Sequence, residues 1–184
     1  IALRYPRGAA PEVDWGAPPA PVALGRAEPL ADGDDVALVA IGSMVRPAFV
    51  AAQALREEGI RATVINARFA RPLDEEAILG AAARTRRLVL AEENVIAGGF
   101  GAAVLELLSA RGLHGVRTRL LGIPDHFVEH GAPDILRKTI GLTADDIAAA
   151  ARELVGRAPA LPDHELTPPD AVVRAASRAP RRPA

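Results

Sequence analysis

Several residue types and patterns are missing from the sequence, and each absence excludes a class of protein. The 184 residues include no cysteine, so the chain can form neither a disulfide framework nor a thiolate metal site. With 22 Lys+Arg against 23 Asp+Glu, the formal net charge of −1 argues against a broad electrostatic surface for nucleic acid or anionic membranes. No apolar run approaches the roughly 20 residues that a membrane-spanning helix needs. The composition instead predicts a globular domain with a real core.

Proline is scarce in the middle of the chain. Twelve of the 16 prolines lie within residues 6–29 or 159–183, so two Pro-rich flanks enclose a Pro-poor body. Residues 9–33 predict an extended connector, and residues 158–184 predict a disordered tail. The sequence begins at Ile1 with a strand-like apolar pattern that lacks the features of a signal peptide. We therefore expect it to begin inside a larger protein.

Residues 34–157 alternate strand patterns with helical patterns. The continuous apolar run over residues 36–41 is typical of a strand buried on both faces of a parallel sheet. The other expected strands are 62–66, 88–91 and 116–121, and the expected helices are 48–58, 75–85, about 102–112, 133–140 and 143–156. This alternation predicts an α/β domain with an open, mostly parallel sheet covered by helices on both faces.

Local signals refine this prediction at three positions. Asp74 stands where it can cap the helix over residues 75–85, and Thr143 with Asp146 resembles a capping box at the start of the last helix. Arg117 and Arg119 alternate with apolar neighbours, which indicates a strand with one wet face. We therefore expect the strand over residues 116–121 to lie near an edge of the sheet.

Two arginines lie at the end of the first strand-like segment. Arg4 and Arg7 belong to residues 4–8, and open α/β sheets bind ligands at strand ends. Arg7 is followed by Gly8, so its guanidinium could bind a phosphate in bidentate fashion with little crowding. The residues alone leave a second interpretation open, in which both are ordinary surface arginines.

Glu92 and Glu93 follow the predicted strand over residues 88–91. A carboxylate held there in a partly dry site could have a raised pKa and serve as a general acid or base. More often, such a pair caps a helix or forms a bridge to a neighbouring chain. We favour that structural role.

Two further motifs also admit a binding role and a structural one. The glycine-rich residues 98–101 could bind an anion at a helix start, but they lack the spacing of a P-loop or dinucleotide fingerprint. Close packing of a helix against the sheet or another subunit is the expected use. His126 and His130 are four residues apart, but Pro124 and Gly131 argue against a helix that would bring both to one metal. We expect a structured loop with an incidental or interface histidine.

Seven short motifs occur in a fixed order between about residues 3 and 156. They are Arg4-Tyr5-Pro6-Arg7-Gly8, Ala40-Ile41-Gly42-Ser43-Met44-Val45, Val64-Ile65-Asn66-Ala67-Arg68-Phe69 with Pro72-Leu73-Asp74, Glu92-Glu93-Asn94-Val95, Gly98-Gly99-Phe100-Gly101, Gly122-Ile123-Pro124-Asp125 and His130-Gly131. Each motif alone is weak. Together, and in this order, they resemble the 1-deoxy-D-xylulose-5-phosphate synthase family, which comprises thiamine-diphosphate enzymes related to transketolase.

The resemblance implies that the chain is the C-terminal portion of such a synthase. Members of this family condense pyruvate with D-glyceraldehyde 3-phosphate, with loss of carbon dioxide, in the biosynthesis of isoprenoid precursors, thiamine and pyridoxal. The resemblance also implies thiamine diphosphate and Mg²⁺ as cofactors and a homodimer in the bacterial cytoplasm. Arg7 matches the family arginine that contacts the acceptor phosphate. The resemblance gives no direct role to Glu92, Glu93 or His130.

The resemblance also divides the chain. Residues 1–8 would be the closing strand of a preceding thiamine-diphosphate-binding (pyrimidine) domain, 9–33 a linker and 34–157 a transketolase C-terminal-type domain. The family's motif for the cofactor diphosphate and metal, and its ring-activating glutamate, have no counterpart in the sequence. We therefore expect no catalytic, cofactor or metal residues here, no synthase activity from this chain alone, and the missing N-terminal and middle domains as its partners.

Two other functions remain open at this point. The C-terminal domain of a 2-oxo acid dehydrogenase E1 β-subunit shares the fold and several motif positions, although such an enzyme needs no sugar-phosphate contact from residues 4–8. A non-catalytic module that only dimerises or docks is an alternative from another class.

Overall fold

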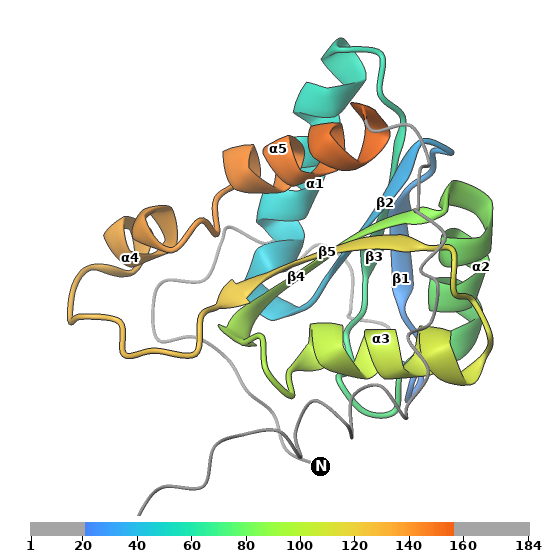
Figure 1. Cartoon of the computed structure of the whole chain (residues 1–184), viewed down its shortest axis with the longest axis horizontal. Helices are drawn as coiled ribbons and strands as arrows, with labels where there is room; N and C mark the ends of the chain where they lie inside the picture. The colour runs from blue at the N-terminus through green and yellow to red at the C-terminus, as the bar shows by residue number, and fades with distance from the viewer. Residues whose placement is uncertain (1–20, 157–184) are drawn as a thin grey trace, which may run out of the picture.

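The computed structural model describes residues 21–156, which form one sheet with helices around it (Figure 1). In chain order the elements are β1 (Glu28–Ala31), β2 (Val36–Ala40), the 3₁₀ helix η1 (Gly42–Met44), α1 (Val45–Glu57), β3 (Ala62–Asn66), α2 (Glu75–Thr85), β4 (Arg87–Val95), α3 (Phe100–Ala110), β5 (Arg117–Ile123), α4 (Pro133–Thr139) and α5 (Ala144–Gly156). The strand order is β1-β3-β2-β4-β5. Within this part of the chain, no helix combines the length and apolar character needed to cross a bilayer.

The sheet is parallel except at one edge. The pairs β2–β3, β2–β4 and β4–β5 are parallel, which confirms the predicted fold class. Strand β5 lies at an edge, as the alternation of Arg117 and Arg119 predicts. The opposite edge is β1, which runs antiparallel to β3 with Glu28 opposite Asn66. The sequence predicts only a connector there. Strand β1 has four residues and includes Pro29, and such a segment is too short to show the alternation of apolar and polar residues that marks a strand.

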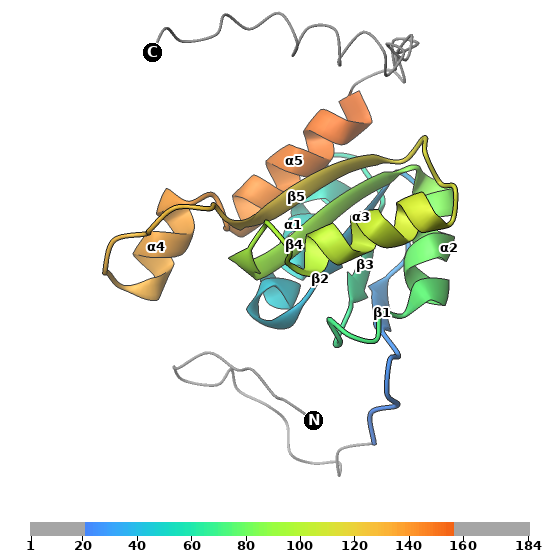
Figure 2. The same ribbon diagram turned by 60° about the horizontal axis from the view of Figure 1, so that its bottom comes forward.

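Helices cover both faces of the sheet (Figures 1 and 2). Helices α1 and α5 pack on one face, whereas α2 and α3 pack on the other. In β2, Val36, Leu38 and Ala40 join the core under α1 and α5. Ala37 and Val39 alternate with them and join the core under α2 and α3. Both faces of β2 are therefore dry, which explains why its sequence is continuously apolar.

Both predicted helix caps are confirmed. The Asp74 carboxylate accepts a hydrogen bond from the backbone N–H of Ala77 at 3.1 Å, and its other oxygen accepts one from the N–H of Ala27 at 2.8 Å. Asp74 therefore starts α2 and also fastens the chain that leads into β1. At α5, the Thr143 hydroxyl accepts from the N–H of Asp146, whose carboxylate accepts in return from the N–H of Thr143.

Asp74 is expected to make the stability of the domain depend on pH. Its side chain is buried, which raises its pKa, but the hydrogen bonds from Ala27 and Ala77 and the nearby Arg26 outweigh this effect, so that the pKa lies below its ordinary value of 3.8. A carboxyl group with a lower pKa in the folded state stabilises the fold above its unfolded pKa. That contribution is lost as the pH falls through the range below about 4.

We expect Asp74→Ala to lower the free energy of unfolding at pH 7 by about 2 kcal/mol, because the change removes a helix cap and a tertiary hydrogen bond. Urea denaturation measures this loss, and the difference from the unmodified chain should shrink as the pH falls below about 4. Asp134→Ala, at an exposed position near the start of α4, is the matched control and should change stability by less than about 0.5 kcal/mol. An equal loss for both variants, or a loss independent of pH, would contradict this role.

Candidate functional site at the carboxyl edge of the sheet

The carboxyl ends of β2, β3, β4 and β5 lie at the same edge of the sheet. In open α/β sheets, ligands bind outside this edge, where neighbouring strands lead to helices on opposite faces. Here β2 leads to α1 on one face, while its neighbour β4 leads to α3 on the other (Figure 2). The expected crevice therefore lies between the end of β2, followed by Ser43, and the end of β4, which carries Glu92 and Glu93.

Glu92 is engaged by the start of helix α3. Its side chain is buried, one carboxylate oxygen accepts a hydrogen bond from the N–H of Phe100 and the other accepts from the N–H of Gly101, both at 2.8 Å. These are unpaired N–H groups of a first helical turn, where the helix dipole also favours a negative charge. Glu92 therefore acts as an internal helix cap, which confirms the structural role favoured from the sequence.

Glycines make room for this buried carboxylate. A Cβ atom on Gly99 would lie 2.5 Å from a Glu92 oxygen and 2.4 Å from the carbonyl oxygen of Val95. A Cβ atom on Gly122 would lie 2.8 Å from the Ile96 side chain. The glycine-rich segment thus serves close packing of α3 on the sheet, as predicted. The anion at this helix start is the protein's own Glu92.

Glu93 links the segments that follow β2 and β5. Its carboxylate accepts a hydrogen bond from the Ser43 hydroxyl and forms a bidentate pair with Arg137 of α4, with Nε at 2.8 Å and Nη2 at 3.2 Å. The hydrogen bond to Glu93 raises the pKa of Arg137 above its ordinary value, although partial burial opposes this shift. Sequence reasoning missed Ser43 and Arg137, because no local pattern connects residues so far apart in the chain.

Residues near Glu28 fix the place where the connector joins the domain. The Glu28 carboxylate accepts a hydrogen bond from the Asn66 side chain at 3.1 Å and forms an ion pair with Arg68 at 2.8 Å. Because Glu28 pairs with the last residue of β3, the preceding chain arrives at the carboxyl edge. Arg7, the predicted phosphate-binding residue, lies outside the described residues.

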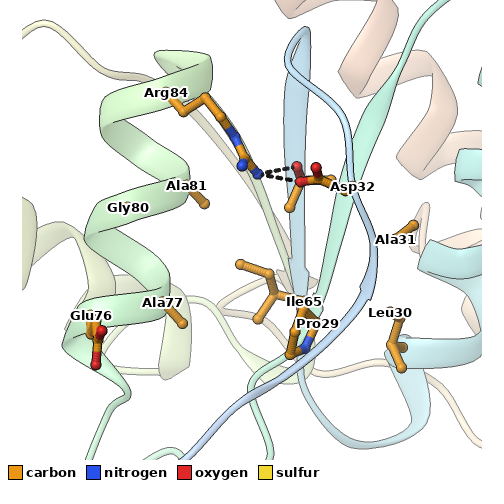
Figure 3. Close-up of a pocket in the computed structure, with 11 residues that line it drawn as sticks. Pro29, Leu30, Ala31, Asp32, Ile65, Glu76, Ala77, Gly80, Ala81 and Arg84 are labelled. Carbon is orange, nitrogen blue, oxygen red and sulfur yellow. Dashed lines mark hydrogen bonds and ion pairs between the residues drawn. The ribbon is translucent and has the colours of Figure 1, made fainter.

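A hollow lies away from this edge, between β1 and α2 (Figure 3). Its volume is about 600 Å³, and apolar groups such as Pro29 and Ile65 line it. Arg84 forms an ion pair with Asp32 at 2.8 Å and donates a hydrogen bond to the Thr63 hydroxyl at 2.8 Å. Glu76, which also lines the groove, forms an ion pair with Arg26 at 2.8 Å. Each of these charged groups has a partner, so we assign no chemistry to this groove.

The loop after β5 forms another hollow, at the carboxyl edge. Residues 124–131 and α4 enclose about 590 Å³, and both predicted histidines, His126 and His130, line it in exposed positions. Across residues 21–156, no group of three or more His, Cys, Asp or Glu side chains is arranged to hold a metal ion. His126 and His130 are exposed residues of the loop between β5 and α4.

Comparison with known proteins identifies the domain. The profile of the transketolase C-terminal domain matches residues 25–147. The chain belongs to this family. A solved structure named "Split gene transketolase, inactive beta4 tetramer" superimposes on this transketolase C-terminal domain with a TM-score of 0.74 and 36% sequence identity, covering 82% of this chain and 48% of that chain.

The transketolase C-terminal domain also has similar relatives among curated proteins. The chain is 54% identical over 151 residues to the 1-deoxy-D-xylulose-5-phosphate synthase of Desulforudis audaxviator. It is 56% identical over 150 residues to 1-deoxy-D-xylulose-5-phosphate synthase 1 of Geobacter sulfurreducens. Each match covers 82% of this chain but 24% of the relative, so the chain spans about a quarter of the length of these synthases.

Proposed function

We propose that the chain is the C-terminal part of a 1-deoxy-D-xylulose-5-phosphate synthase, which condenses pyruvate with D-glyceraldehyde 3-phosphate and releases carbon dioxide. The observation that carries this proposal is the identity above one half with two synthases over about 150 residues. The same relatives argue against the C-terminal domain of a 2-oxo acid dehydrogenase. As the family resemblance implies, the complete enzyme would be a homodimer in the bacterial cytoplasm.

The cofactors of such a synthase would be held by other domains. Thiamine diphosphate supplies a nucleophilic carbon to this chemistry, and Mg²⁺ binds its diphosphate. The described residues do not fit either group, because α3 engages Glu92, while Ser43 and Arg137 engage Glu93. We therefore derive no catalytic step from residues 21–156. The described domain would instead support the active site formed by its partner domains.

The contribution of this chain to the substrate site would be Arg7. A guanidinium can donate two parallel hydrogen bonds to the phosphate of D-glyceraldehyde 3-phosphate and so hold it in place. The described domain supports this proposal indirectly, because Glu28 is held by Asn66 and Arg68, and Ala27 is held by Asp74. These contacts fix the point on the carboxyl edge from which the connector leads back to Arg7.

A fusion enzyme tests the proposed function. The part of the Desulforudis audaxviator synthase that precedes its matched region is joined to this chain, and product is measured from pyruvate and D-glyceraldehyde 3-phosphate with thiamine diphosphate and Mg²⁺. We expect turnover by the fusion and none above background by the isolated chain, which lacks the partner domains.

The controls separate the alternatives. The upstream part without this chain shows whether the domain is needed for turnover. A folded fusion that binds thiamine diphosphate but forms no 1-deoxy-D-xylulose 5-phosphate would contradict the proposal. Decarboxylation of pyruvate that needs a lipoyl acceptor instead of the sugar phosphate would support the dehydrogenase alternative. Turnover by the isolated chain would refute the proposal that partner domains hold the cofactors.

A further inference from the structure

Helix α4 is fixed to the domain in a different way from the other α-helices. No residue of α4 is buried, Ile135 is 65% exposed, and the helix projects from the body of the domain (Figures 1 and 2). Helices α1, α2, α3 and α5 each bury several side chains, and such packing supplies most of the stability of a helix in a protein. We call residues 124–139, which comprise α4 and the loop before it, the loop–α4 segment. Its position therefore depends mainly on polar contacts.

The loop–α4 segment is anchored at both ends. Just before it, the carbonyl oxygen of Ile123 in β5 accepts a hydrogen bond from the N–H of Ile96 at 3.0 Å. Just after it, Ile140 packs on the core under α1 and α5, and Leu142 is buried. Gly141 turns the chain between these two residues with a φ of +72°, which suits glycine. The segment can therefore open as a unit between its anchors while the sheet stays intact.

Glu93 reaches this segment from the centre of the carboxyl edge. Strand β4 lies between β2 and β5, and its register with β5 shifts near its end. Such irregularities re-aim the side chains at the end of a strand. Glu92 turns to the start of α3, whereas Glu93, the next residue, contacts Ser43 after β2 and Arg137 after β5. Glu93 thus bridges the segments that follow both neighbouring strands.

The contact between Glu93 and Arg137 is suited to hold the segment in place. It is bidentate, and each side chain is only 27% exposed, so solvent screens the charges less than at an open surface. Arg137 also pairs with Asp134 on α4 at 3.3 Å. When the segment opens, Arg137 keeps this local partner, so the charge on α4 does not oppose opening. The contact with Glu93 therefore decides between a closed and an open state.

Ser43 acts on the same contact from the other side. Its hydroxyl donates a hydrogen bond to Glu93 Oε2, the oxygen that also accepts from Arg137 Nη2. A carboxylate oxygen has room for both bonds. Ser43 lies in η1, directly before α1, and holds the Glu93 side chain in the conformation that meets Arg137. The start of α1 is thereby coupled to α4 through one carboxylate.

We propose that Ser43, Glu93 and Arg137 form a latch that holds the loop–α4 segment closed, and that Ser43 controls the opening of this segment through Glu93. The segment opens by local unfolding when the latch breaks. This inference goes beyond the proposed function, because it concerns the motion of the segment and does not depend on the reaction.

Amide hydrogen exchange in the full 184-residue chain tests the proposal. The N–H groups of Leu136 and Ile140 donate to the carbonyl oxygens of Ala132 and Leu136, each at 3.0 Å. An isolated helix as short as α4 is unstable in water, so opening breaks these bonds and permits exchange. In the unmodified chain, we expect both amides to be protected, but less than the amides of β2, and to respond weakly to urea. Glu93→Ala should speed their exchange roughly 10- to 100-fold.

A double-mutant cycle tests the coupling through Glu93. Ser43→Ala should speed exchange in α4 by roughly 3-fold in the otherwise unmodified chain, but should have no effect beside Glu93→Ala. Arg137→Gln should reproduce the effect of Glu93→Ala. A Ser43→Ala effect that persists beside Glu93→Ala would overturn the coupling, because Ser43 would then act by another route.

The matched control removes a second bidentate pair on the same side of the sheet. Arg152 of α5 donates to both carboxylate oxygens of Glu58, at 2.8 and 2.6 Å. Glu58→Ala should leave exchange in α4 unchanged, because this pair lies outside the latch. Circular dichroism verifies that each variant is folded. The proposal would be overturned by unprotected α4 amides in the unmodified chain, by α4 amides that exchange only with the whole domain, or by Glu93→Ala without effect on α4.

Discussion

Replacing Glu92 with alanine is expected to lower the free energy of unfolding by about 4 kcal/mol, because each hydrogen bond to a charged group contributes about 1.5–3 kcal/mol. The change leaves the N–H groups of Phe100 and Gly101 without their buried acceptor and removes the negative charge at the start of α3. Urea denaturation followed by circular dichroism measures the loss. Few single substitutions have so large an effect in a domain of this size.

Two control variants separate this structural role from catalysis. Glu92→Gln keeps one acceptor oxygen and should lose about half as much stability as Glu92→Ala. Glu57→Ala removes an exposed glutamate on α1 and should cost less than about 0.5 kcal/mol. A similar small loss at Glu92 would contradict the capping role. In the fusion enzyme, folded Glu92→Gln should retain its turnover, whereas a catalytic carboxylate would lose several orders of magnitude.

The sheet and its helices could be predicted because the signals are local. A strand buried on both faces reads as a continuous apolar run in residues 36–41, and Asp74 and Thr143 mark helix starts by residue type. Strand β1 was missed because its stability comes from pairing with β3 and from the contacts of Glu28, which no sequence period reveals.

The candidate site was predictable only in part. The sequence placed Glu92 and Glu93 after a strand that ends at residue 91, whereas β4 continues through both residues to Val95. The nearby glycines correctly indicated close packing. The partners of Glu93 could not be inferred, since Ser43 and Arg137 come together only through tertiary structure. The role of Arg7 rests on the resemblance to the synthase family and stays a prediction.

The second large effect is expected at Arg7, in the fusion enzyme. Arg7→Ala removes a bidentate contact worth about 3 kcal/mol, so KM for D-glyceraldehyde 3-phosphate should rise by roughly 100-fold. KM for pyruvate should change little, because pyruvate carries no phosphate. Arg7→Lys keeps the positive charge but loses the planar guanidinium. Its KM for D-glyceraldehyde 3-phosphate should lie between the values for the unmodified enzyme and for Arg7→Ala.

The most direct test of the account compares two acceptors in the same fusion enzyme. The ratio of kcat/KM for D-glyceraldehyde 3-phosphate to that for unphosphorylated D-glyceraldehyde measures how strongly the site recognises the phosphate. If this chain completes the acceptor site of a 1-deoxy-D-xylulose-5-phosphate synthase, Arg7→Ala should reduce the ratio by roughly 100-fold while the chain stays folded. An unchanged ratio would contradict the account.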